Sequence, residues 1–145
     1  MKNRSVPVDT ILPHIVYRDV PEAIAWLSLA FGFVEHYRYG ELPDSIGAQV
    51  HLGDAWMMLE SVKPNSSTPA QLGARTQSLT IFVDDVAAHY TKAKSAGATI
   101  VEDLHETIYG ELQYAALDFE GHHWLFSRHA KDVSPDAWGA KIATR

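Results

Sequence analysis

Residues 14–33 read HIVYRDVPEAIAWLSLAFGF, a strand-like run followed by a helical pattern that ends at a glycine. Asp19 is a good helix N-cap, and Pro21 stands in the first turn, where a missing N–H costs nothing. Apolar side chains recur at helical spacing up to Phe31, and Gly32 suits the left-handed position that ends a helix. The segment therefore predicts a β-strand followed by an amphipathic α-helix.

A second copy of this unit follows about 66 positions later, where residues 84–86 (DDV) correspond to residues 18–20 (RDV). The last strand of each copy begins in a similar way, with GDAW at 53–56 and GHHW at 121–124. A repeat of this length indicates paired supersecondary units, and two copies favour one closed body over a solenoid.

The chain is therefore predicted to be a single domain of two βαβββ modules. Module one spans about 8–62, a linker rich in Pro, Ser and Thr spans 63–75, module two spans about 76–130, and a tail helix spans about 134–142. We expect an α+β fold in which the modules form a curved, mostly antiparallel eight-stranded half-barrel with helices on its outer face. The expected strands are 11–17, 33–39, 48–52, 56–62, 77–83, 100–108, 112–117 and 124–128. The expected helices begin after residues 19 and 85, and residues 40–47 are expected to form a turn.

The composition excludes several classes of protein. The 145 residues carry a formal net charge of −6, which argues against nucleic-acid binding, because phosphates require clustered Lys and Arg. Without cysteine the chain has neither disulfides nor thiolate metal ligands, which is compatible with a cytoplasmic location. We find no apolar run long enough to cross a membrane and no signal-peptide pattern in the first 13 residues.

The run at 14–33, together with IYGE at 108–111 and DFEGHHWLF at 118–126, resembles the glyoxalase/bleomycin-resistance/dioxygenase family, also called the vicinal oxygen chelate family. It looks closest to the subgroup described as PhnB-like or glyoxalase-like, and the resemblance covers roughly residues 10–130. It implies a cupped β-sheet that holds a small molecule. In metal-dependent members it also implies an ion that polarises a substrate oxygen.

The resemblance places four metal-facing positions, on the first and last strand of each module. Counted from the shared Asp and Gly anchors, these positions hold Leu12, Met58, Ser78 and Leu125. Three apolar side chains and one hydroxyl cannot hold a divalent ion. We therefore expect no metal cofactor at the family's site.

Side chains alternate between the two faces of a strand, so these positions also indicate which neighbours face the cavity. His14 and Glu60 face it beside the metal positions, either as hydrogen-bonded polar groups, as an acid–base pair or as displaced metal ligands. Trp56 offers a surface on which a planar or cationic ring can stack. The predicted ligand-binding residues are Trp56, Met58, Ser78, Thr80, Phe82, Tyr109, His123 and Leu125.

Two functional hypotheses follow, and whether the protein is an enzyme stays open between them. The first is a metal-free protein that binds a small, aromatic molecule in the half-barrel, like the sequestering bleomycin-resistance branch of the family. The second is a metal-dependent lyase or dioxygenase whose ligands are shifted to His14, Glu60 and His123; a metal-free isomerase with His14 or Glu60 as base lies between them. Under either hypothesis we expect a homodimer, because the half-barrel has exposed sheet edges.

Overall fold

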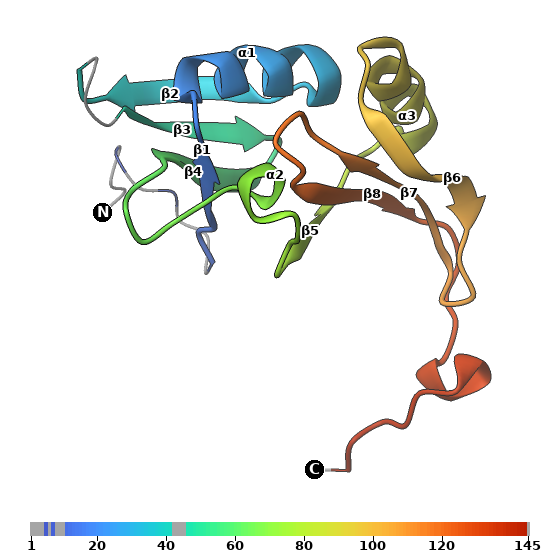
Figure 1. Ribbon diagram of the computed structural model, residues 1–145. Coiled ribbons are helices and arrows are strands. Elements are labelled where there is room, and N and C mark those ends of the chain that lie inside the picture. Colours follow the sequence, from blue (N-terminus) through green and yellow to red (C-terminus); the bar gives the residue numbers. More distant parts are fainter. Residues whose placement is uncertain (1–4, 6, 8–10, 42–45, 145) are drawn as a thin grey trace.

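The computed structural model describes residues 5, 7, 11–41 and 46–144, which form two βαβββ modules (Figure 1). The predicted turn at 40–47 falls partly outside these residues. Module one consists of β1 (His14–Tyr17), α1 (Val20–Phe31), β2 (Val34–Tyr39), β3 (Gly47–Leu52) and β4 (Ala55–Ser61). Module two consists of β5 (Ser78–Phe82), α3 (Val86–Ser95), β6 (Thr99–Glu106), β7 (Glu111–Leu117) and β8 (His123–His129).

Each module forms its own four-stranded mixed sheet, with the strand orders β1-β4-β3-β2 and β5-β8-β7-β6. The first and last strands of a module pair in parallel, whereas the hairpin-connected strands pair antiparallel. The two sheets have the same strand order, as the sequence repeat predicted. The α+β fold of two βαβββ modules with mostly antiparallel strands is confirmed.

The two long helices lie on the same side of the molecule and contact each other (Figure 1). Phe31, the last residue of α1, brings the modules into one core: its ring centroid lies 5.7 Å from that of Trp124 and 4.7 Å from that of Phe126. All three side chains are fully buried. The helices cover one face of each sheet. On the other face, β5 of module two is exposed, whereas Gln49 and Met58 of module one are buried, and Gln49 donates to the backbone carbonyl of Ser5.

The predicted helix ends are confirmed in both modules. The Asp19 side chain accepts a hydrogen bond from the backbone N–H of Glu22, 3.0 Å away, and Gly32 closes α1 with a left-handed backbone (φ 82°). Asp85 caps α3 in the same way by accepting from the N–H of Ala88. These side chains satisfy backbone donors that the first turn of a helix leaves free.

The segment 63–75 is less irregular than its composition predicted, because it contains a short helix, α2 (Pro69–Leu72). The Thr68 side chain accepts from the N–H of Gln71, and the Gln71 side chain accepts from the N–H of Thr68. This reciprocal capping box stabilises one helical turn in a stretch that is otherwise poor in helix formers. The segment is therefore a structured connection between the modules.

The tail helix predicted through Ile142 is too long. The structure has a single 3₁₀ turn, Pro135–Trp138, which Gly139 ends with a left-handed backbone (φ 100°). Ser134 makes no capping hydrogen bond to this turn, because its hydroxyl donates to the Asp136 side chain instead. We refer to residues 130–144 as the C-terminal arm; it extends away from the two sheets (Figure 1).

Within the described parts of the chain, no helix is long and apolar enough to cross a membrane.

Candidate functional site

The strands of module two separate a core face from an open face. Trp124 and Phe126 are buried on the helix-covered side of β8. Ser78, Thr80 and Phe82 alternate with core residues along β5, and all three are exposed; Phe82 is 67% accessible to solvent. The alternation expected from the sequence is therefore confirmed on these two strands, and an aromatic ring stands free on the open face.

On the face of module one that the helices do not cover, His14 and Glu60 form a hydrogen-bonded pair. Their Nδ1 and Oε1 atoms lie 2.8 Å apart, with 53% of the His14 and 30% of the Glu60 side chain exposed. A neutral His14 in this geometry donates its Nδ1–H and leaves the lone pair of Nε2 available. The pair is thus suited to accept a proton from a molecule on this face, while its exposure keeps the contribution to stability small.

Trp56 lies on the same face, within a cluster of aromatic and imidazole rings. The His51 ring stacks on it with centroids 4.3 Å apart and planes at 21°, and the His36 ring meets it edge-on at 5.4 Å. The His36 ring is held in turn by Gln49, whose Oε1 lies 2.6 Å from Nδ1. Two imidazole rings therefore pack against the indole, which remains partly exposed.

A groove of about 570 Å³ lies between the β3–β4 turn and β5. Its volume is within the usual range for small-molecule sites. Two of the predicted ligand-binding residues, Thr80 and Phe82, line it, whereas Trp56 is not among the described residues of its lining. We call this feature the inter-module groove; its lining residues are Leu52, Gly53, Asp54, Ala55, Thr80, Ile81, Phe82, Val83 and Asp84.

Four further predicted ligand-binding residues belong to module two and fall in two places. In the parallel register of β5 and β8, His123 lies beside Ser78, and Leu125 beside Thr80. Nδ1 of His123 is buried without a hydrogen-bond partner among the described residues, and this burial lowers the pKa of His123. Tyr109 lies apart, in the β6–β7 turn, where its ring packs on Trp138 of the C-terminal arm and its hydroxyl donates to Gln113.

A buried carboxylate holds the modules together where β1 meets the β7–β8 turn. Asp118 accepts hydrogen bonds from the Tyr17 hydroxyl (2.7 Å), the Trp124 indole N–H (3.1 Å), and the backbone N–H groups of Glu120 (2.9 Å) and His122 (3.0 Å). Burial and the neighbouring carboxylates raise the pKa of Tyr17 well above its ordinary value, so its hydroxyl remains a donor. Asp118 therefore has a structural role.

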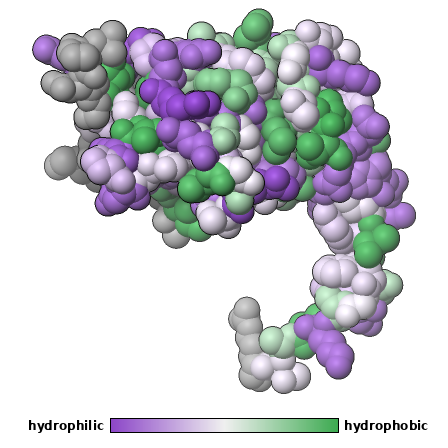
Figure 2. Space-filling view, viewed as in Figure 1, coloured by the Kyte–Doolittle hydropathy of each residue, from purple (hydrophilic) through white to green (hydrophobic). Residues whose placement is uncertain are grey.

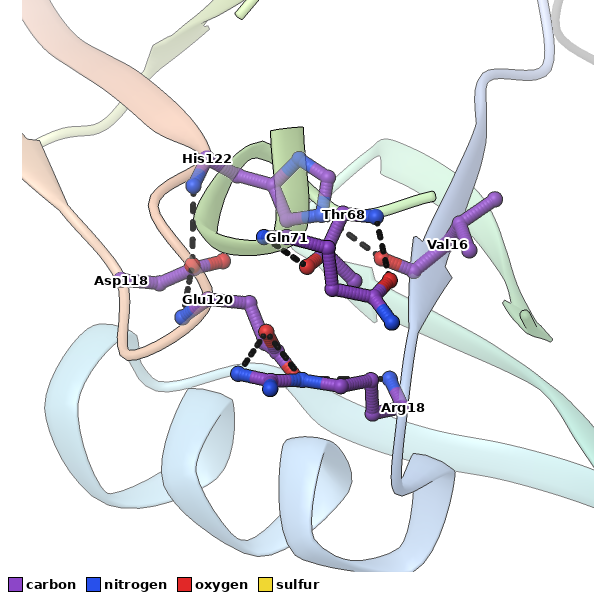
Figure 3. A network of polar contacts seen from close by, with 7 residues as sticks. All are labelled: Val16, Arg18, Thr68, Gln71, Asp118, Glu120 and His122. Atoms are coloured by element: carbon purple, nitrogen blue, oxygen red, sulfur yellow. Dashed lines mark hydrogen bonds and ion pairs between the residues drawn. The ribbon is translucent and has the colours of Figure 1, made fainter. Parts of the chain in front are cut away.

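Two further contacts reinforce this junction (Figure 3). The buried Glu120 carboxylate pairs with the Arg18 guanidinium at 2.8 Å, and this partner together with hydrogen bonds keeps the pKa of Glu120 low despite burial. His122 donates from Nε2 to the backbone carbonyl of Val16, 2.7 Å away. Figure 3 also shows the α2 capping box beside these contacts. His122 thus connects the β7–β8 turn to β1.

Comparison with known proteins identifies the family. Residues 8–126 match the sequence profile of the Glyoxalase/Bleomycin resistance protein/Dioxygenase superfamily. The chain belongs to this superfamily.

Relatives of this superfamily member are similar over most of its length. The uncharacterized protein Mb0911c of Mycobacterium bovis is 30% identical over 142 residues, which cover 92% of this chain and 91% of the relative. The crystal structure of TioX from Micromonospora sp. ML1 superimposes with a TM-score of 0.69 at 30% identity, covering 83% of this chain and 98% of TioX. The fold is also that of a glyoxalase/bleomycin resistance protein/dioxygenase family enzyme from Burkholderia phytofirmans PsJN. Its crystal structure superimposes with a TM-score of 0.59 at 22% identity, covering 80% of this chain and 94% of that enzyme.

The four positions that the sequence resemblance assigned to a metal ion carry side chains that do not fit one. Leu12 and Leu125 are hydrocarbon side chains, Ser78 offers one hydroxyl, and the thioether of Met58 is buried with Gln49 Nε2 3.4 Å from its sulfur. Across residues 11–41 and 46–144, no three side chains of His, Asp or Glu are close enough to hold an ion. The shifted set of His14, Glu60 and His123 is therefore not assembled within one chain.

Sequence reasoning missed His89, which connects the two long helices. Its Nδ1 lies 2.5 Å from the Tyr114 hydroxyl and its Nε2 lies 2.8 Å from the carbonyl oxygen of Phe31. Burial lowers the pKa of His89, so the ring is held neutral in the core. Tyr114 is fully buried there. In the sequence, His89 stands out only as a histidine that follows two alanines of α3. This local pattern does not indicate that its ring contacts Tyr114 and Phe31.

Proposed function

We propose that this superfamily member binds a small, aromatic molecule on its open sheet faces without the help of a metal ion. One observation carries the proposal: the four positions that hold an ion elsewhere in the superfamily carry Leu, Met, Ser and Leu. The inter-module groove, with the exposed Phe82 ring, supplies an apolar surface of suitable volume close by. Ligand pockets commonly combine such a surface with a few polar groups. The cysteine-free chain also suits the reducing cytoplasm, where we place the protein.

Trp56 is the residue expected to contribute most to stacking with a planar ligand. Replacing Trp56 by alanine should weaken the binding of acridine, a planar and weakly basic probe, by about 1–3 kcal/mol, as expected for the loss of an aromatic anchor. Binding is followed as quenching of tryptophan fluorescence, in buffer containing a chelator so that metal plays no part. Trp138→Ala, which removes a tryptophan of the C-terminal arm, is the control and should retain the wild-type affinity. Equal affinities in wild type and Trp56→Ala would contradict the assignment of Trp56.

We also propose that the protein is a homodimer. The C-terminal arm projects from the body (Figure 2) and exposes two apolar side chains, with Trp138 39% and Ile142 68% accessible. Exposed apolar groups and unpaired edge strands are commonly covered by a second copy. Light scattering at micromolar concentration should give the dimer mass, and deletion of the arm after Asp132 should shift it toward monomer. A wild-type monomer, or a truncated protein that still dimerises fully, would refute this proposal.

The hydrogen-bonded pair of His14 and Glu60 favours a second candidate, a metal-dependent lyase or dioxygenase. A histidine that donates one ring N–H to a carboxylate and keeps the other nitrogen free is the usual arrangement of a metal ligand. Because His123 does not join the pair within one chain, a third ligand would have to come from elsewhere, such as a second copy. Metal that is retained by the wild type and lost in His14→Ala would support this candidate over metal-free binding.

A further inference from the structure

We infer that the inter-module groove selects organic cations with an apolar body. This inference rests on the proposed binding function and names the charge and shape of the molecule that the groove accepts.

The charge of the groove comes from two aspartates on different modules. Asp54 lies in the β3–β4 turn, and Asp84 lies two residues after the end of β5. Both are exposed, and neither carboxylate has a hydrogen bond or ion pair with any other described residue. The lining contains no Lys, Arg or His. Lys92 lies near the Leu52 end of the lining but forms no ion pair with either carboxylate among the described residues. Two carboxylates without an ion-pair partner at one groove attract a cation and repel an anion, and the net charge of −6 strengthens this preference.

The apolar part of the groove comes from β5. Phe82 exposes 67% of its surface, and Leu52, Ile81 and Val83 also contribute to the lining. An exposed ring is unfavourable in water, so a ligand that covers Phe82 gains the free energy of burying it. The face of the ring is also electron-rich and attracts cations. Phe82 and the two aspartates therefore favour the same kind of molecule.

Other charged groups near the open faces are less suited to this role. Glu60 already accepts a hydrogen bond from His14. The small pocket between β1 and the 63–75 segment, about 110 Å³, is lined by Arg75, His14 and His122 and has no carboxylate in its lining. A cation is therefore drawn to the inter-module groove rather than to the junction.

The test compares two probes of nearly the same shape and opposite charge, tetraphenylphosphonium and tetraphenylborate. Isothermal titration calorimetry at low ionic strength should show the cation binding at least about tenfold more tightly than the anion, as expected for two nearby carboxylates in a partly open groove. The double variant Asp54→Asn/Asp84→Asn should weaken the cation about tenfold and abolish the difference between the probes. Asp132→Asn/Asp136→Asn alters the net charge equally, on the C-terminal arm, and should behave like the wild type.

Phe82→Ala separates the charge preference from binding itself. Because Phe82 is exposed, this variant should fold as the wild type does, and it should lose affinity for both probes. If both probes bind wild type equally well and Phe82→Ala weakens both, the cation inference is overturned while apolar binding in the groove stands. A cation that binds equally well to the groove double variant and to the arm double variant would also overturn it. If neither probe binds, the groove is not a site for apolar ions; acridine binding tests the wider function separately.

Discussion

Replacing Asp118 by alanine is expected to lower the free energy of unfolding by about 3–5 kcal/mol, the range found when one partner of a buried polar network is removed. Only 5% of Asp118 is exposed, and its carboxylate accepts four hydrogen bonds, two from side chains and two from the backbone. Alanine would leave the buried Tyr17 hydroxyl and Trp124 N–H without acceptors. Because Tyr17 belongs to module one and Trp124 to module two, the contact between modules should weaken.

Urea denaturation followed by circular dichroism measures this loss. Asp103→Ala is the matched control, since Asp103 is an exposed carboxylate that accepts one hydrogen bond, from the Tyr90 hydroxyl at 2.6 Å. Its removal should cost no more than about 1 kcal/mol. A similar loss in the two variants would mean that the Asp118 network does not hold the modules together.

Gly110→Ala should destabilise the protein by about 2–4 kcal/mol through a steric clash added to backbone strain. Gly110 adopts φ 90°, and a Cβ atom there would lie 2.0 Å from the carbonyl oxygen of Lys131. The Gly110 carbonyl also accepts hydrogen bonds from the N–H groups of Ala130 (2.8 Å) and Lys131 (3.0 Å). The added methyl group would therefore displace the start of the C-terminal arm.

Gly97→Ala separates the two causes of this loss. Gly97 has nearly the same backbone conformation, φ 94°, but a methyl group added there would meet no atom within 4 Å. Its variant should therefore lose only the cost of the left-handed conformation, about 1–2 kcal/mol. Thermal or urea unfolding gives the difference between the variants, and faster amide exchange at Ala130 and Lys131 should accompany Gly110→Ala alone. Equal losses would contradict the predicted clash.

Local patterns in the sequence were sufficient to predict the fold. The caps at Asp19 and Asp85 and the helix end at Gly32 depend on neighbours three or four residues away, so they can be read from the chain. The same holds for the strand alternation that places Trp124 inside and Thr80 outside. The tail prediction was wrong because the sequence Ser134-Pro135-Asp136 can start a helix but does not supply the contacts that extend it past Gly139.

The candidate site was only partly predictable. Alternation identified Phe82 as exposed, but Asp54 and Asp84 meet at one groove only because the modules pack side by side. Asp54 stands in a short turn and Asp84 precedes the helix cap Asp85, and neither local setting indicates a shared groove. Likewise, the four donors to Asp118 come from residues up to 101 positions away, and no local pattern indicates such a network.

The central claim is that binding needs no metal, and the metal content of the purified protein tests it most directly. Protein prepared without chelator should be incubated with Zn²⁺, Ni²⁺, Fe²⁺ or Mn²⁺, desalted and analysed by inductively coupled plasma mass spectrometry. Because Leu12, Met58, Ser78 and Leu125 offer no adequate ligand set, we predict less than about one equivalent of any of these metals per chain. A full equivalent that survives desalting, and that disappears in His14→Ala or Glu60→Ala, would contradict the account and favour the metal-dependent enzyme.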